Sequence, residues 1–401
     1  MDTQKAPNPF NPGSPVDPQD FVGRIAELEN FRQKLNQTSS GSLANMAVVG
    51  GYGVGKTSFL HKCKAIAEEF GALTIYFSMN EVDNITDRET LARVLIKRVQ
   101  EKVREEVILQ RISSGILKIL QKIRIKTEGG IELSIGEDTE PYPNLQAALR
   151  AAWNALKDNK KAIVFLLDEA RVLEKNRADL VLYLRAVLEQ LQVTYTPVMI
   201  IPAGKLTISG PSGSGFSPLV RTFPPAILEN LSQAECQTFI QKKLGKAQIK
   251  VEGSTIREAY EVTEGHPFVL SAYMELAYTK LSPHEDCLTG QHLKAADLEF
   301  VSRKLVPFFS RFYDQAGRKS KKILNQLAKN KNGESTIAEL SQSLGKEYNE
   351  LSPNLAKLVQ DGAIIRVDRG RYRLFHHLLG AYINNKSSSE QDQSPSFSEN
   401  P

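Results

Sequence analysis

The feature that most constrains this chain is a glycine-rich segment at residues 50–57, GGYGVGKT. It matches the pattern GxxxxGK[ST], in which the backbone N–H groups of a loop surround phosphate oxygens. The apolar run before it, residues 45–50, predicts a buried strand, and the residues after it predict a helix. Because the pattern needs both flanks, they favour a phosphate-binding loop at the carboxyl end of a parallel strand over an ordinary glycine turn.

Each residue of this loop has a chemical role in that interpretation. Lys56 neutralises the β- and γ-phosphate charge, Thr57 offers its hydroxyl to Mg²⁺, and Ser58 follows in the first turn of the helix. The backbone that wraps the phosphates belongs to Gly50, Gly51, Tyr52, Gly53, Val54 and Gly55. The predicted ligands are therefore ATP and Mg²⁺.

A second segment supplies the carboxylates that this chemistry needs. Residues 162–169, AIVFLLDE, form an apolar run that ends in Asp168 and Glu169. At the carboxyl edge of the sheet we expect Asp168 to hold the Mg²⁺ shell and Glu169 to orient or deprotonate the attacking water. Together with Lys56 they form the predicted catalytic set. A solvated acidic pair at a strand end is the alternative.

Up to about residue 226 the chain alternates short β-branched runs with longer amphipathic segments, a pattern typical of a parallel sheet flanked by helices. Residues 21–226 are the predicted α/β core. Its strands are predicted at 45–50, 73–78, 162–167 and 198–202. All four are continuous apolar runs, as expected for strands buried on both faces. A long insertion is predicted at residues 97–142, with a hairpin at 124–136.

The C-terminal part predicts two further domains. Residues 227–317 predict a helical lid, whose first helix begins with Ser232 and Glu235 at capping-box spacing. Residues 318–386 predict three short helices, the third from about Ser352, and then two strands, a combination typical of a winged helix. The two ends, residues 1–20 and 387–401, are predicted to be extended and disordered, respectively.

With these motifs in place, the chain resembles the AAA+ and STAND branch of P-loop ATPases, in particular its archaeal-type and origin-recognition-like members. The segment FVGR, which contains Val22, Gly23 and Arg24, is similar to the family's motif beside the adenine. The segment EGHPFVL, with His266 and Pro267, looks like the family's Gly-x-Pro motif, which places the lid against the base. A plain helix start is the alternative for FVGR. Taken alone, His266 is more often a packing or capping residue than a ligand.

Two positions depart from the family's pattern. Members usually place Asn, Ser or Thr after the strand that follows the acidic pair, where it senses the γ-phosphate. Here only Lys205 and Thr207 stand nearby, so hydrolysis is expected to be slow. Arg221 resembles the arginine that reaches a neighbouring subunit's nucleotide, which implies a nucleotide-dependent homo-oligomer. An ordinary surface arginine is the alternative reading of that position.

Positive charge is concentrated in two segments, although the net charge is only +5. Residues 97–126 hold nine Lys/Arg against three Glu, and residues 318–386 hold thirteen against six acidic residues, which suggests a polyanionic partner for one or both segments. For residues 97–126, which lack aromatic anchors, a solvated or partner-docking helix face is favoured over binding to DNA or to an acidic membrane surface. The predicted contacts to duplex DNA are Arg366, Arg369, Arg371 and Arg373 of the wing and Lys357 of the third helix. Because that helix is otherwise weakly basic, backbone contacts are favoured over base readout, and docking on protein is the alternative.

Composition excludes several classes of protein. Hydrophobic residues at 41% and charged residues at 24% are typical of a globular chain. The sequence shows neither a membrane-spanning run nor an apolar signal region, so a cytoplasmic location is predicted. Cys63, Cys236 and Cys287 stand far apart, which favours buried thiols over disulfides or zinc.

These features predict an ATP-binding and hydrolysing molecular switch that couples its nucleotide state to DNA binding through the winged helix. The main alternative is a STAND-type signalling or scaffold ATPase whose winged helix binds protein. A small-molecule kinase fits less well, because the Asp168-Glu169 pair suits water activation and a winged helix follows the lid.

Overall fold

The computed structural model describes residues 6–81, 85–110, 144–173, 178–206, 218–330 and 332–392. The chain divides into two compact units. One is Pro15–Glu229, and the other joins Met1–Ser14 to Asn230–Pro401. The division near residue 229 lies close to the boundary predicted between core and lid. Among the described residues, no helix is long and apolar enough to cross a membrane.

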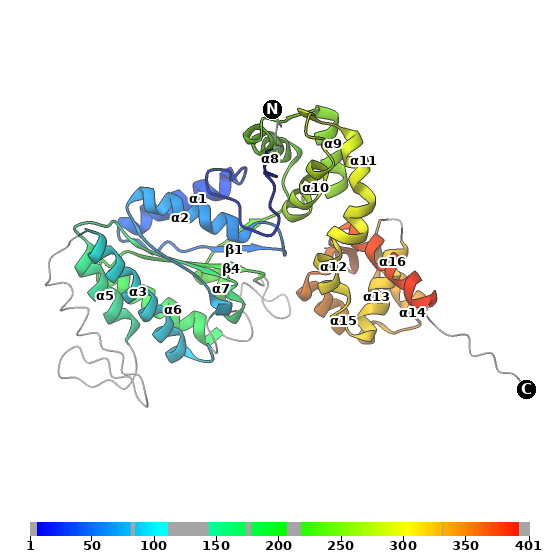
Figure 1. Cartoon of the computed structure of the whole chain (residues 1–401). Helices are drawn as coiled ribbons and strands as arrows, with labels where there is room; N and C mark the ends of the chain where they lie inside the picture. The colour runs from blue at the N-terminus through cyan, green and yellow to red at the C-terminus, as the bar shows by residue number, and fades with distance from the viewer. Residues whose placement is uncertain are drawn as a thin grey trace, which may run out of the picture. The chain divides into compact units, whose positions relative to one another are not determined.

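The first unit is built on a parallel five-stranded sheet with the strand order β2-β3-β4-β1-β5 (Figure 1). Its strands are β1 (Ala47–Gly50), β2 (Leu73–Ser78), β3 (Ile163–Asp168), β4 (Val198–Gly204) and β5 (Pro225–Leu228). The first four confirm the predicted strands, and β3 is buried along its whole length, as its apolar sequence requires. The fifth strand was not predicted. It is short, lies at the sheet edge and begins with a proline, which is tolerated there.

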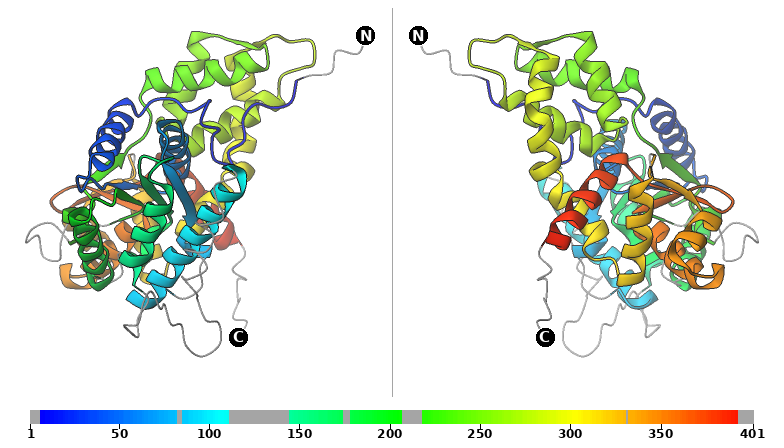
Figure 2. Two further views of the ribbon diagram at one scale, coloured as in Figure 1. Left: turned by 90° about the vertical axis from the view of Figure 1, so that its left-hand side faces the viewer. Right: turned by 90° about the vertical axis from the view of Figure 1, so that its right-hand side faces the viewer.

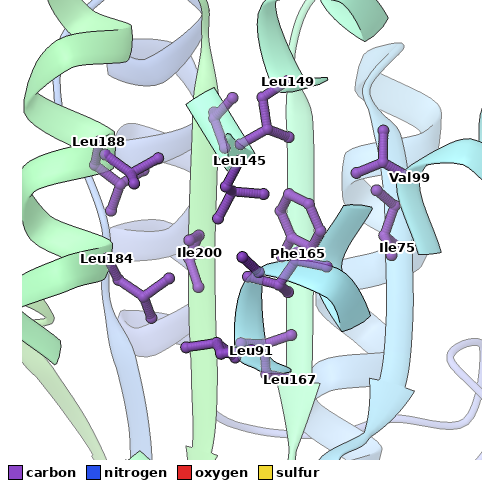
Figure 3. Packing of buried hydrophobic residues seen from close by; sticks show 14 of the residues in the cluster. Ile75, Leu91, Val99, Leu145, Leu149, Phe165, Leu167, Leu184, Leu188 and Ile200 are labelled. Carbon is purple, nitrogen blue, oxygen red and sulfur yellow. The ribbon is translucent and has the colours of Figure 1, made fainter. Parts of the chain in front are cut away.

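Helices cover both faces of this sheet. One face is covered by α1 (Ile25–Ser39) and α2 (Lys56–Phe70), and the other by α3 (Arg88–Gln110), α5 (Leu145–Leu156), α6 (Ala178–Val193) and the short α7 (Pro218–Thr222). Short 3₁₀ helices, η1 (Met79–Glu81) and η2 (Ala170–Leu173), follow β2 and β3. Side chains alternate along β3, so that Phe165 and Leu167 face α3, α5 and α6 (Figure 3), while Val164 and Leu166 face the α1–α2 side.

Helix α3 changes the predicted boundary of the insertion. It begins at Arg88 and ends at Gln110, and its Val99 and Val103 are buried in the core of the sheet. Residues 97–110 therefore belong to the core helix. The predicted hairpin at 124–136 and the rest of the insertion lie outside the described residues.

The second unit begins with a group of helices. It contains α8 (Gln233–Lys246), α9 (Gly253–Thr263), α10 (Pro267–Thr279), α11 (Gly290–Glu299), the π-helix η4 (Phe300–Lys304) and α12 (Val306–Tyr313), with the two-residue strands β6 (Lys250–Val251) and β7 (Cys287–Leu288). The predicted capping box is present at the start of α8: the Ser232 hydroxyl accepts from the Glu235 N–H, and the Glu235 carboxylate accepts from the Ser232 N–H. The N-terminal segment packs here, because Phe10 contacts Phe239 edge to face.

The rest of this unit follows the order helix, strand, helix, helix, strand, strand, helix. Its elements are α13 (Arg318–Lys329), β8 (Glu334–Thr336), α14 (Ile337–Leu344), α15 (Tyr348–Asp361), β9 (Ile364–Asp368), β10 (Arg371–Leu374) and α16 (His377–Asp392). The three strands form an antiparallel sheet in the order β8-β10-β9, and α16 lies beside α13 (Figure 2).

Three features of this region differ from the sequence prediction. Helix α15 starts at Tyr348 rather than at Ser352, because Glu347 and Glu350 form a capping box before it and Pro353 falls within its first turns. Strand β8 was not predicted. Helix α16 extends to Asp392, into the segment predicted to be disordered.

Candidate nucleotide-binding site

The phosphate loop between β1 and α2 is shaped by its glycines. Gly53 has a φ of 79° and Gly55 a φ of 92°, conformations that other residues rarely adopt. Gly50 meets a different requirement, since a Cβ there would lie 2.8 Å from the carbonyl oxygen of Leu228 in β5. The loop therefore needs glycine at these three positions.

Lys56 is the first residue of α2, and its ammonium group turns back onto the loop. Its Nζ donates to the carbonyl oxygen of Gly51 at 2.7 Å and to that of Gly50 at 3.3 Å. The N-terminus of the 15-residue helix α2 opens at the same loop, where the helix dipole favours an anion. A cation and a helix N-terminus thus converge on one loop, as phosphate binding requires.

Asp168 lies at the end of β3, two strands away in the sheet, and meets the start of α2. Its Oδ2 accepts from the Thr57 hydroxyl at 2.7 Å and from the Tyr76 hydroxyl at 3.2 Å. The ring of His61 packs against Tyr76 edge to face at 4.8 Å. Burial lowers the pKa of His61, an effect that the nearby Asp168 carboxylate opposes. Burial and Asp168 together raise the pKa of Tyr76, so its hydroxyl stays a donor.

Glu169 follows on a strained backbone, with a φ of 49°. Its N–H donates to Asp168 Oδ1 at 2.9 Å, which orients that carboxylate from the other side. Its own Oε2 lies 3.8 Å from Arg171 Nε, and about a third of its side chain (33%) is exposed. A partly exposed carboxylate next to a buried one suits the activation of water beside a metal.

The oxygen atoms of Thr57 and Asp168 fit Mg²⁺. Mg²⁺ binds oxygen ligands at about 2.1 Å in an octahedron, so neighbouring ligands lie roughly 2.9 Å apart. Thr57 Oγ1 and Asp168 Oδ2 are separated by 2.7 Å and stand beside the phosphate loop. A hydroxyl and one carboxylate, completed by phosphate oxygens and waters, form a usual Mg²⁺ donor set.

The FVGR segment is anchored to the same helix and to the edge of the sheet. Phe21 packs edge to face on Phe59 of α2, with ring centroids 6.1 Å apart. Arg24 is buried, has a φ of 57° and donates from Nη2 to the carbonyl oxygen of Glu229, just after β5. The Ser58 hydroxyl accepts from the Val16 N–H at 3.0 Å. Ser58, predicted to bind nucleotide, is thus in contact with the extended N-terminal segment.

Lys205, the predicted sensor of the γ-phosphate, and Arg221, the arginine predicted to reach a neighbouring subunit, lie at different places in the first unit. Lys205 directly follows β4, which lies between β3 and β1, and Gly204 pairs with Val49 just before the phosphate loop. It therefore stands at the strand end next to both the loop and Asp168. Arg221 lies on the surface in α7, before β5. Thr207 lies outside the described residues.

Comparison with known families agrees with this geometry. A family model described as the AAA ATPase domain matches residues 20–201, which include FVGR, the phosphate loop and the Asp168-Glu169 pair. Residues 20–201 are an AAA ATPase domain. The predicted P-loop ATPase core is therefore confirmed. A second family model, described only as a domain of unknown function (DUF8462), matches residues 306–383, from α12 into α16.

Individual relatives are distant. A Walker-type ATPase of Pyrococcus abyssi aligns over 96% of this chain and 100% of its own, with a TM-score of 0.59 and 16% identity, and so shares the fold. The RuvB Holliday junction branch migration motor of Thermotoga maritima aligns over 94% and 96%, with a TM-score of 0.45 and 16% identity. An uncharacterized HTH-type transcriptional regulator of Methanocaldococcus jannaschii is 27% identical over 152 residues, 37% of this chain. The match spans only about a third (36%) of that protein's length.

The motif predicted for the lid, Gly265, His266 and Pro267, belongs to the other unit and lies outside the residues matched by the AAA ATPase model. Gly265 has a φ of 67°, and Pro267 is the first residue of α10. His266 is the N-cap of that helix, is 3% exposed and accepts from the Val269 N–H through Nδ1. Its side chain therefore packs and caps, as the alternative interpretation of His266 predicted.

The proposed DNA contacts lie on the outside of the C-terminal sheet and on α15. Arg366, Arg369 and Arg371 are exposed on and between β9 and β10, while Arg373 is half-buried. Arg371 pairs with Glu334 of β8 at 3.3 Å. Lys357 is exposed on α15. Four of these five side chains thus present their charge on the surface.

Three residues at the nucleotide site were not found from the sequence: Tyr76, His61 and Arg171. Tyr76 lies in the predicted strand 73–78, and its contact with Asp168 depends on the parallel pairing of β2 with β3. Arg171 stands two residues after Glu169, and that spacing after an acidic pair was the one available signal. Tyr76 therefore supplies Asp168 with a donor that the sequence motifs did not indicate.

Proposed function

We propose that this protein is an ATP-hydrolysing molecular switch whose nucleotide state controls binding of duplex DNA by residues 318–392, which act as a winged helix. The main observation in support is the contact of Thr57 with Asp168 beside a phosphate loop that carries Lys56. These groups belong to a AAA ATPase domain.

In this proposal the residues of the core divide the hydrolysis of ATP among them. Lys56 neutralises charge on the β- and γ-phosphates, and Thr57 and Asp168 hold Mg²⁺, which supplies further positive charge when bound. Glu169 takes a proton from the attacking water. The water oxygen bonds to the γ-phosphorus, the bond from that phosphorus to the β–γ bridging oxygen breaks, and ADP and phosphate result. Lys205, at the end of β4, detects the γ-phosphate.

The lid gives the switch its two states. We propose that Val22, Gly23 and Arg24 border the base from the core and that Pro267 borders it from the lid. ATP then favours the state in which both units touch the nucleotide, because only that state makes the additional contacts. Arg221, exposed in α7, reaches the nucleotide of a second copy in a homo-oligomer.

Duplex DNA is the proposed partner on the basis of charge and relatedness. The exposed arginines of β9, β10 and the turn between them suit phosphate contacts. The curated relative is described as an HTH-type transcriptional regulator, which favours the same class of partner.

A protein partner is the second candidate. On β9 the side chains of Ile365 and Val367 are 39% and 49% exposed beside Arg366, and apolar surface of this kind suits a protein contact better than a phosphate backbone. The proposed experiment separates the two.

The test is the affinity for a labelled duplex from low to physiological salt, measured without nucleotide, with ADP and with ATP. ATP is supplied to the Glu169→Gln variant, which should bind ATP without turnover, while Lys56→Ala should not bind it. Replacing Arg366, Arg369, Arg371 and Arg373 by Ala should weaken binding and flatten its dependence on salt. The matched control removes four exposed positive charges from the lid helices and η4: Lys242, Arg257, Lys294 and Arg303.

The outcomes differ for the two candidates. Nucleotide-dependent binding that is lost with the wing arginines and kept in the control supports the DNA switch. No duplex binding in any nucleotide state, with ATP binding intact, rejects DNA and favours the protein partner. Full ATP turnover by Glu169→Gln removes Glu169 from its assigned role.

A further inference from the structure

The loop between α9 and α10, taken with its flanking residues as 263–267, is held by several contacts. Gly265 accepts from the Leu231 N–H at 2.9 Å, and a Cβ on Gly265 would lie 2.0 Å from the Leu231 carbonyl oxygen. The carbonyl oxygen of Glu264 accepts from Asn230 Nδ2 at 3.0 Å. Residues 230 and 231 directly follow the core unit in the chain, so the loop is held by the connection between core and lid.

The same loop is held from its other side by the start of α16. His376 Nε2 lies 2.9 Å from the carbonyl oxygen of Thr263, and His377 Nδ1 lies 2.9 Å from Glu264 Oε1. The Leu378 N–H donates to His376 Nδ1 at 3.2 Å, so Nε2 carries the proton and donates to Thr263. Burial lowers the pKa of His376 to about 4, which is consistent with a neutral ring.

The residues that hold the loop are directly connected to the wing. Strand β10 ends at Leu374, and Phe375, His376 and His377 follow without a break. The Phe375 N–H donates to the carbonyl oxygen of Ala363, just before β9. The His266 ring lies within about 6 Å of the rings of Phe375 and His376, at 6.1 and 6.0 Å. The loop is therefore linked, through His376 and Phe375, to both ends of the wing hairpin.

We propose that Glu264, His376 and His377 form a latch through which the loop at residues 263–267 passes the nucleotide state of the lid to the wing. This inference rests on the proposed function, because it needs a lid that responds to nucleotide. The inference goes beyond that function by naming the residues that connect the lid to the partner-binding surface. Glu264, His376 and His377 are not among the residues predicted to touch nucleotide or DNA.

The geometry of Glu264 explains why the latch has two states. Its φ of 49° lies in the left-handed region, which a glutamate adopts at a cost. The pairing with His377 favours this conformation, and the hydrogen bond to His377 lowers the pKa of Glu264 and keeps it charged. When nucleotide binding shifts the lid loop, the pair opens and Glu264 relaxes. Interfaces of this kind switch between discrete arrangements rather than deforming continuously.

A metal site is the other way to explain the cluster. One ligand atom from each of Glu264, His376 and His377 lies within 4.8 Å of the others. Both ring nitrogens of His376 are already hydrogen-bonded to backbone, however, so a metal ion would have to displace one of them. Hydrogen bonding accounts for all three side chains without an ion.

The latch is tested with Glu264→Gln, His377→Gln and the double variant in the full chain. Both side chains are partly exposed, at 32% and 44%, so the variants should fold, which the melting temperature checks. The matched control is His284→Gln, at an exposed histidine in the loop before β7. Amide hydrogen exchange of residues 263–270 and 371–383 is followed with and without Mg²⁺ and a non-hydrolysable ATP analogue.

In the wild type and the control, the analogue should change exchange in both segments. In the variants the change at 263–270 should persist, while that at 371–383 should fall by up to about fivefold, the range of one partly exposed polar pair. The double variant should resemble either single variant, since both remove one interaction. An undiminished response at 371–383 in the double variant overturns the latch.

Two other results are distinguishable from that one. If residues 263–270 respond in the wild type and 371–383 do not, the latch fails and the nucleotide-responsive lid stands. If neither segment responds although the analogue binds, the proposed switch fails, and the latch fails with it.

Discussion

Replacing Gly265 by alanine should destabilise the second unit more than the addition of one methyl group usually does. The residue has a φ of 67°, where an L side chain costs about 1–2 kcal/mol. The new Cβ would lie 2.0 Å from the Leu231 carbonyl oxygen, a backbone atom that cannot turn away. The loop must therefore shift and lose the hydrogen bond from Leu231, which leaves a buried donor unpaired at about 1–3 kcal/mol. The expected loss is between about 2 and 5 kcal/mol.

The matched control is Gly345→Ala in the same unit. Gly345 has a φ of 60°, but no atom lies within 4 Å of the added Cβ, so only the backbone cost of about 1–2 kcal/mol applies. Urea unfolding of the second unit is followed by hydrogen exchange, while fluorescence of Trp153 in α5 reports the core unit of the same sample. Equal destabilisation by the two variants would refute the steric argument, and a shift in the Trp153 transition would place the effect in the wrong unit.

Three further outcomes follow from named contacts. Tyr76→Phe removes one hydrogen-bond donor to Asp168 and should raise the Mg²⁺ concentration needed for nucleotide binding about fivefold. Nucleotide binding without Mg²⁺ should be unchanged. A Mg²⁺ titration that matches the wild type would contradict this role of Tyr76. Asn45→Ala should cost about 1–3 kcal/mol in the Trp153 transition, because the buried Asn45 Oδ1 accepts from the Ile200 N–H at 2.8 Å. The pKa of His376 is near 6.5 in the unfolded chain and about 4 in the native chain, so the unfolded chain binds a proton first as the pH is lowered. The free energy of unfolding should therefore decrease as the pH is lowered from 7 to 5, by about 2 kcal/mol. In urea titrations, His376→Gln should reduce this dependence of the free energy of unfolding on pH. If the variant keeps the wild-type dependence, other groups that face this ring cause it: Glu264, His266, Arg373 and His377.

The nucleotide-binding core was predictable because its determinants are local. A glycine loop after one apolar run and an acidic pair after another identify β1 and β3, and parallel strands bring their carboxyl ends to one edge. The edge strand β5 escaped prediction because Pro225 and its alternating burial remove the signal of a buried strand. The carbonyl oxygen of Leu228 in this strand nevertheless explains why position 50 needs glycine, since it leaves no room for a Cβ there.

Contacts between elements were the part that the sequence did not predict. The position of Tyr76 on Asp168 follows from the register of β2 against β3, in which Ser78 pairs with Asp168. The contacts of His376 and His377 join segments more than a hundred residues apart. No periodicity within either segment contains that information, since it arises from packing of the whole unit.

Backbone strain connects the sites that were recognised separately. Among the described residues, five other than glycine have positive φ, and three of them are Arg24, Glu169 and Glu264. Each lies in a segment that the sequence assigned to the nucleotide machinery: FVGR, the acidic pair and the lid loop. Each is also an ionisable residue with a polar partner. Arg24 contacts the carbonyl oxygen of Glu229, Glu169 lies beside Arg171, and Glu264 pairs with His377. At each of these positions the polar contact helps to hold a strained conformation, so a change of contacts there makes a second, relaxed arrangement available. Such elements suit a protein that changes state with its nucleotide, because relaxation at one of these positions releases about 1–2 kcal/mol of backbone strain.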